Sequence, residues 1–162
     1  MLVIKKFPEP VLRKVSAPIT RFDSSLEKLV KRLIKIMKAQ PGGVGIAAPQ
    51  IGILKKVAVV DVSPKVASTG LLVLINPEIV KLDREIVLRE GCMSLPDYTA
   101  NVKRYDVVTI KGRDLLGGHI IHQATGLEAR CIQHEVDHLN GILFVDRVAS
   151  LHSDVFRRKK YL

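Results

Sequence analysis

Two histidines and a glutamate near residue 134 have the spacing that metal chemistry requires. Residues 131–138 read Cys-Ile-Gln-His-Glu-Val-Asp-His, so His134 and His138 are four positions apart. A helix turns once in about 3.6 residues, so both imidazoles project from one face, with Glu135 beside them. Two imidazoles on one cation, with a carboxylate next to any water bound there, is the arrangement that a metal hydrolase needs. The spacing therefore predicts a hydrolytic metal site.

The helix that carries these residues is expected over 126–140 and has more than one apolar side. Its second apolar stripe consists of Ala129, Ile132, Val136 and Leu139. A helix covered on several sides lies in the centre of a fold, so its histidines and glutamate are expected to be buried. Buried imidazoles and carboxylates need polar partners, and a metal site supplies them. The alternative, that the two histidines are ordinary surface residues, does not fit so apolar a helix. Thr125 and Glu128 have the spacing of a capping box, and Gly141 suits the left-handed position after the helix.

A third metal ligand is required, because a catalytic zinc-type site has three protein ligands and one open position. Two cysteines compete for this role. Cys131 lies one turn before His134 on the same helix, which strains coordination by all three side chains. Cys92 follows Gly91 at the end of an expected strand, where a glycine permits an unusual backbone that aims the sulfur. A lone cysteine is also a common core residue, so the residues alone leave both interpretations open.

A loop of small residues, 41–50, follows the first expected helix. Gly43, Gly45 and Ala48 imitate a dinucleotide fingerprint, but that motif follows a strand and opens a helix, whereas this one follows a helix and reaches Pro49. We therefore reject nucleotide binding. Glycines also serve where backbone lies flush against a ligand, so we expect this loop to border a tight pocket.

The remaining elements predict an α+β fold. An amphipathic helix over 23–38, with a capping box at 24–27, has a lysine- and arginine-rich polar face and is expected to be scaffold. Short β-prone runs cover 56–62, 71–75, 85–90, 107–111 and 119–122. No crossover helix separates these runs, so they predict antiparallel pairing. The expected architecture is small antiparallel β-sheets wrapped around a central metal-binding helix.

Length, charge and composition narrow the class of protein. At 162 residues with 47% hydrophobic content, a single domain over 1–162 is expected. The N-terminus has no signal-peptide pattern and no stretch is long enough to span a membrane, so we expect a cytoplasmic protein without membrane contact. A net charge of +10 permits a phosphate-rich partner, but few aromatic residues accompany it, which argues against sequence-specific nucleic-acid binding.

Three motifs together resemble the peptide deformylase family. They are Gly-Val-Gly-Ile-Ala-Ala-Pro-Gln at 43–50, Glu-Gly-Cys-Met-Ser at 90–94 and Gln-His-Glu-Val-Asp-His at 133–138, in the family's order. The similarity extends through most of the chain. It implies removal of the N-formyl group from the initiator methionine of newly made polypeptides, with release of formate.

The resemblance also implies a role for each site residue. The implied metal ligands are Cys92, His134 and His138. For a substrate of this kind we expect a tight loop at Gly43 and Gly45 beside the formyl group, and an apolar pocket for the methionine side chain made by Val44, Leu88, Leu127 and Cys131. Metal-bound water would be the nucleophile and Glu135 the general base and acid. The side-chain amide of Gln50 and the backbone N–H of Met93, where the family usually has leucine, would stabilise the oxyanion. We expect Fe(II), with Zn, Ni or Co as alternatives.

The expected partners are N-formylmethionyl nascent peptides and, through the basic surface and the run at 157–160, the ribosome. Two other functions remain to be separated from this one. A metalloprotease of the H-E-x-x-H type would cleave internal peptide bonds, and a non-enzymatic RNA-binding domain with a structural zinc would have four protein ligands. We further expect Glu90 to pair with Arg104, and His119, His122 and His152 to be surface residues.

Overall fold

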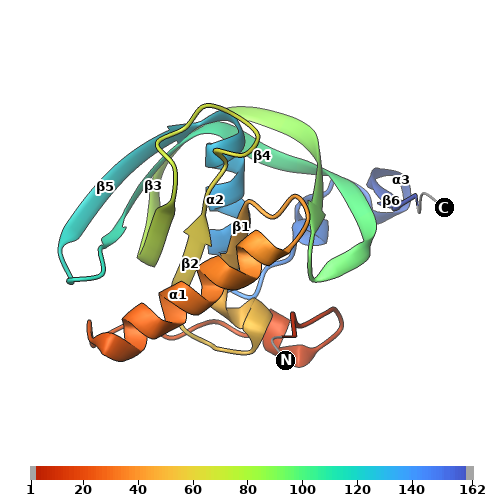
Figure 1. Cartoon of the computed structure of the whole chain (residues 1–162). Helices are drawn as coiled ribbons and strands as arrows, with labels where there is room; N and C mark the ends of the chain where they lie inside the picture. Colours follow the sequence, from red (N-terminus) through yellow and green to blue (C-terminus); the bar gives the residue numbers. More distant parts are fainter. Residues whose placement is uncertain (1–2, 160–162) are drawn as a thin grey trace.

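The structure is a computed structural model and describes residues 3–159 (Figure 1). In chain order the elements are η1 (Pro10–Arg13), α1 (Ser24–Ala39), β1 (Gly45–Ala47), η2 (Ala48–Ile51), β2 (Val57–Val60), β3 (Leu72–Cys92), β4 (Leu95–Arg113), β5 (His119–Thr125), α2 (Gly126–Leu139), η3 (Phe144–Arg147), α3 (Leu151–Asp154) and β6 (Val155–Arg157). This order confirms an α+β fold with antiparallel strands.

The strands expected as several small sheets form one continuous sheet. Its order is β1-β2-β3-β4-β5, and β6 pairs with the first part of β4, whose second part pairs with β5. The longest strands are β3 and β4, with 21 and 19 residues, which form a hairpin much longer than the short runs predicted there. The first of these runs was expected to end at residue 75, but a register shift between Ile75 and Glu78 accommodates Asn76 and Pro77, so the strand continues past them.

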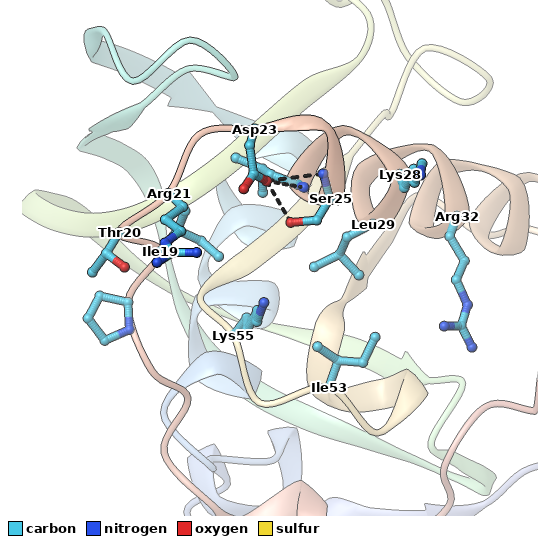
Figure 2. A pocket seen from close by; sticks show the side chains of 12 residues that line it. Ile19, Thr20, Arg21, Asp23, Ser25, Lys28, Leu29, Arg32, Ile53 and Lys55 are labelled. Atoms are coloured by element: carbon cyan, nitrogen blue, oxygen red, sulfur yellow. Dashed lines mark hydrogen bonds between the residues drawn. The ribbon is translucent and has the colours of Figure 1, made fainter.

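Helix α1 begins one residue earlier than the expected capping box places it. The N-cap is Asp23, whose Oδ1 accepts hydrogen bonds from the backbone N–H groups of Ser25 (3.0 Å) and Leu26 (3.4 Å), as Figure 2 shows. The buried face packs against β1 and β2 and consists of Leu26, Leu29, Val30, Leu33, Ile36 and Met37. The lysines and arginines of the other face are exposed, and α1 carries none of the predicted site residues.

A hollow of about 520 Å³ lies at the start of α1, beside Ile53 and Lys55 (Figure 2). It is lined by none of the site residues that the sequence predicted. No helix within residues 3–159 is long and apolar enough to cross a membrane.

Helix α2 lies under the arch of β3, β4 and β5 (Figure 1), and its predicted apolar stripe is buried against the sheet. The expected capping box is wrong. Thr125 makes no side-chain cap, and Glu128 instead hydrogen-bonds Nε2 of His122 at 2.7 Å. His122 is therefore half-buried rather than a surface residue. Gly141 has the predicted left-handed conformation, with φ of 73°, and a Cβ there would be 2.5 Å from the carbonyl oxygen of Arg13.

Candidate metal centre

Cys92, His134 and His138 bring one sulfur and two imidazole nitrogens together between the β3–β4 hairpin and α2. Their ligand atoms lie within 4.8 Å of one another. The Sγ atom of Cys92 is 3.3 Å from Nε2 of His138, which is 3.2 Å from Nε2 of His134. Of the two cysteines that the sequence left open, only Cys92 belongs to this group within the described chain.

The position of Cys92 follows from the end of the β3–β4 hairpin. Cys92 pairs with Leu95, and the strand register shifts between Gly91 and Cys92. Such a bulge turns a side chain away from the regular alternation of the strand, and here the sulfur turns toward α2. Gly91 is not among the described glycines with a positive φ, so the expectation of an unusual glycine backbone is wrong.

The donor set suits a divalent cation of the borderline-soft class, which thiolate and imidazole ligands bind well. Burial alone would raise the pKa of the Cys92 thiol, but the two imidazoles beside it lower that pKa well below its ordinary value. The thiolate is the form of cysteine that binds a metal. In addition, Oε2 of Glu135 is buried without a hydrogen-bond partner next to this group. The residues present therefore fit a metal ion.

An ion-pair network behind His134 holds its ring. Glu90 hydrogen-bonds Nδ1 of His134, which leaves Nε2 facing Nε2 of His138 at 3.2 Å. Arg104 donates to both oxygens of Glu90, at 3.1 and 2.7 Å, which confirms the predicted pair. Burial alone would raise the pKa of Glu90, but the hydrogen bonds and charges of His134 and Arg104 lower it to about 2. A carboxylate that fixes the second nitrogen of a histidine is a common partner of metal sites.

Two charged residues of this network were missed from the sequence. Asp137 accepts hydrogen bonds from Arg104 (2.6 Å) and from Arg147 (2.9 Å), so the buried Arg104 lies between two carboxylates. Asp137 lies inside the motif at 133–138, so an acidic residue between the two predicted ligand histidines could have been recognised from the sequence as part of the site. Its partner Arg147 is the last residue of η3, after α2, and no sequence pattern predicts that it lies beside Asp137.

Glu135 projects from α2 beside the ligand group, and only 4% of it is exposed. Burial raises the pKa of its carboxyl group to about 7, against a smaller opposing effect of the imidazoles. A carboxyl group with a pKa near neutrality can both accept and donate a proton, which is the property of a general acid–base catalyst.

Gln50 is also buried, and its amide has a fixed orientation. Its Oε1 accepts a hydrogen bond from the backbone N–H of Ala47 at 2.9 Å, so its Nε2 must face the other way. There Nε2 donates to Oγ of Ser94 at 3.1 Å and lies 3.7 Å from Sγ of Cys92. The amide N–H groups therefore point toward the ligand group. Ser94 was not predicted, although it directly follows Met93 in the same motif.

A cavity of about 1090 Å³ opens onto these groups. The predicted residues that line it are Gly43, Val44, Gly45, Gln50, Leu88, Cys92, Met93, Leu127, Cys131, His134 and Glu135. His138 lies behind them, with 1% of its surface exposed. Burial raises the pKa of Cys131 to about 12, so this thiol stays protonated and forms part of the wall.

A buried Cys-His-His group beside a buried glutamate, next to a cavity in an α+β fold, is the arrangement of a metal-binding hydrolase. Comparison with known proteins gives the family. Residues 1–154 match the family described as polypeptide deformylase. The peptide deformylase of Thermodesulfovibrio yellowstonii is 46% identical over 159 residues, covering 98% of this chain and 96% of the relative.

Two solved structures show the same similarity. The crystal structure of the peptide deformylase from Thermotoga maritima has a TM-score of 0.85 and 39% identity, covering 93% of this chain and 99% of the other. The class I type b enzyme from Acinetobacter baumannii, solved bound to Met-Ala-Ser, has a TM-score of 0.85 and 36% identity, covering 91% and 98%. The chain belongs to the peptide deformylase family and is an enzyme of the hydrolase class.

Proposed function

We propose that this chain removes the formyl group from the initiator methionine of new polypeptides and releases formate, with Glu135 as the proton carrier. The observation that carries this proposal is the environment of Glu135. Its carboxyl group is buried beside three ligand atoms, has a pKa of about 7 and keeps Oε2 without a hydrogen-bond partner. These properties suit a group that takes a proton from water and later gives it to the leaving amine.

Cys92, His134 and His138 would hold the metal, which we propose to be Fe(II), with Zn, Ni or Co as replacements. When bound, such a cation polarises a carbonyl oxygen and lowers the pKa of water. Glu90 supports this set by fixing the ring of His134.

Gln50 and Met93 would stabilise the charge that develops on the formyl oxygen. The fixed orientation of Gln50 supports this role, because its N–H groups already face the cavity. Met93 lies in the two-residue turn after Cys92 and would contribute its backbone N–H, so the change from leucine leaves the donor in place. Removal of one such donor typically lowers the rate ~10²–10³-fold.

The lining of the cavity supports a formyl-methionine substrate. Gly43 and Gly45 line it without a side chain, and Val44, Leu88 and Leu127 offer an apolar wall for the methionine side chain. The Acinetobacter baumannii relative was solved with Met-Ala-Ser bound, a peptide of the kind that this reaction would release.

Nascent chains on the ribosome are the proposed source of the substrate, and the net charge of +10 supports attraction to ribosomal phosphate. The basic run at 157–160 is part of this proposal, although its Lys160 lies outside the described residues.

The test uses Glu135→Gln with formyl-Met-Ala as substrate. Formate release should fall ~10²–10⁴-fold while the metal content stays at the wild-type value, because the amide cannot carry the proton but leaves the ligands intact. Cleavage of internal peptide bonds without formate release would identify a metalloprotease instead.

The other alternative is a non-enzymatic RNA-binding domain with a structural zinc. Such a site needs four protein ligands, whereas three converge within residues 3–159.

A further inference from the structure

The last strand of the chain delivers an arginine to the cavity. Strand β6 pairs with β4, with Val155 opposite Ala100 and Arg157 opposite Tyr98. The next residue, Arg158, continues this pairing, because its backbone N–H donates to the carbonyl oxygen of Asp97 at 2.8 Å. Figure 1 shows β6 beside the first part of β4.

The side chain of Arg158 crosses β4 and reaches the β3 strand beside the metal centre. Its guanidinium lies against the α-carbon of Gly91, and a Cβ on that residue would collide with Nη2 and be 3.5 Å from Cζ. Gly91 directly precedes Cys92, and Arg158 lines the same cavity as Cys92 and Glu135. The guanidinium therefore contacts the residue that directly precedes a proposed metal ligand, Cys92.

A second arginine is held in place next to it. The guanidinium of Arg89 lies over the ring of Phe156, with Cζ 3.8 Å from the ring centroid. Arg89 also donates from Nε to Oδ1 of Asn101 at 3.1 Å and from Nη1 to Oγ1 of Thr99 at 3.3 Å. Strands β4 and β6 thus fix Arg89, which also lines the cavity.

The charge of this part of the cavity is not neutralised. The cationic lining residues are Lys6, Lys65, Arg89, Arg130 and Arg158. The two lining carboxylates are Glu90, which is bound to Arg104 and His134, and the proton carrier Glu135. Within residues 3–159 neither Arg89 nor Arg158 forms an ion pair with a carboxylate. A concave positive surface attracts anions, and an arginine fork matches a carboxylate in shape.

We propose that Arg158 is a specificity-determining residue, which binds a carboxylate of the substrate beyond the formyl-methionine. Arg89 supports it by fixing β6 through Phe156. The inference rests on the proposed deformylation. The carboxylate belongs to an acidic side chain in a nascent polypeptide or to the free C-terminus of a short peptide, and both sources present the same two oxygens to the guanidinium.

The experiment measures kcat/KM with matched formyl peptides. One pair, formyl-Met-Ala-Glu-amide and formyl-Met-Ala-Gln-amide, changes only the side-chain charge. The same pair is also made with the Glu or Gln placed one residue earlier in the peptide, and again one residue later. The other pair, formyl-Met-Ala-Ser and its amide, changes only the terminal charge. The variants are Arg158→Gln, Arg158→Lys and the control Arg157→Gln. The control removes the same charge one residue away, from a side chain that does not line the cavity.

The wild-type enzyme should prefer the charged member of at least one pair by about fivefold at low salt, mainly through KM, as expected for one partly exposed ion pair. Arg158→Gln should reduce this ratio to about one, whereas Arg158→Lys should retain part of it and Arg157→Gln all of it. Raising the salt to about 0.5 M should lower the wild-type ratio, because the Debye length falls below 10 Å.

The outcomes separate the inference from the function on which it rests. A wild-type ratio of one in both pairs, or an equal ratio in wild type and Arg158→Gln, would overturn the role of Arg158 while formate release stands. If Arg158→Gln does not fold, the salt dependence of the wild-type enzyme decides. A kcat/KM ratio for the charged over the uncharged peptide that stays the same in high salt would contradict the role of Arg158. A response of only one pair supports the role and identifies the source of the carboxylate. Absence of formate from every peptide with every variant would reject deformylation itself.

Discussion

The carboxylate of Glu135 lies against the α-carbon of Gly45, and a Cβ built on Gly45 would be 2.6 Å from Oε1 of Glu135. Gly45 is outside the group of described glycines with a positive φ, so space, not backbone conformation, is what requires glycine at this position. Gly45, the first residue of β1, therefore makes room for the carboxylate of Glu135.

This contact makes Gly45→Ala a test of how closely Glu135 must be positioned. The added methyl group should displace the carboxylate and lower kcat about 10²-fold, since misplacement by about 1 Å has effects of that size. The metal content should stay at the wild-type value, because the three atoms nearest to the added Cβ all belong to Glu135, which is not a proposed ligand. Steady-state formate release and metal analysis measure both. A wild-type kcat in the variant would mean that Gly45 does not constrain Glu135.

Several features of the site were predictable because local patterns specify them. His134, Glu135 and His138 share a face at any regular helical geometry, and the apolar stripe of α2 is buried as its period required. The need for a third donor predicted that a thiol would approach the two histidines, but it left Cys92 and Cys131 as alternatives. In each case neighbouring residues in the chain, or a simple valence requirement, carried the information.

The rest depends on contacts between distant parts of the chain. The extended β3–β4 hairpin was missed because much of β3 is exposed and its charged residues give no clear alternation. A chain of ion pairs links Glu90 to Arg104, Arg104 to Asp137 and Asp137 to Arg147. These residues lie on β3, β4, α2 and η3, and no local sequence pattern relates them. Glu128 was expected to cap α2, but His122, six residues earlier on β5, takes its carboxylate.

A matched pair of cysteine variants tests the choice of ligand. Cys92→Ser should lose most of the bound metal and the activity with it, because Sγ of Cys92 lies 3.3 Å from an imidazole nitrogen. Cys131→Ser should keep its metal, since burial holds the Cys131 thiol protonated with a pKa of about 12. Metal analysis after anaerobic purification reads both variants. Metal loss in Cys131→Ser with retention in Cys92→Ser would reverse the assignment.

Glu90→Gln tests the support of His134. Loss of the carboxylate should weaken metal binding about 10–100-fold, as measured by competition with a chelator. The metal-free variant should also lose about 1–3 kcal/mol in its free energy of unfolding, because Asp137 is then the one carboxylate that pairs with Arg104 within residues 3–159. Glu85→Gln, on the same strand, is the control. It breaks an exposed pair with Lys103 and should change neither quantity appreciably. Equal effects of both variants would contradict the special position of Glu90.

The pair between Asp146 and Arg13 predicts a pH-dependent part of the stability. Asp146 accepts hydrogen bonds from Arg13 and, at 2.8 Å, from the backbone N–H of Leu143. Partial burial alone would raise its pKa, but these contacts lower it below the ordinary value of 3.8. The folded state therefore binds the proton less readily than the unfolded state does. The resulting stabilisation is fully present above the unfolded pKa and is lost as the pH falls through the folded pKa.

Asp146→Asn removes the charge but keeps an oxygen for Leu143, so it isolates this effect. The metal-free wild type should have a higher free energy of unfolding in urea than the metal-free variant at pH 7, and the difference should shrink below pH 3.8. Using metal-free protein for both removes protonation of the ligands as a cause. A difference at pH 3 as large as at pH 7 would show that the stabilisation comes from side-chain packing, because packing does not depend on the charge of Asp146.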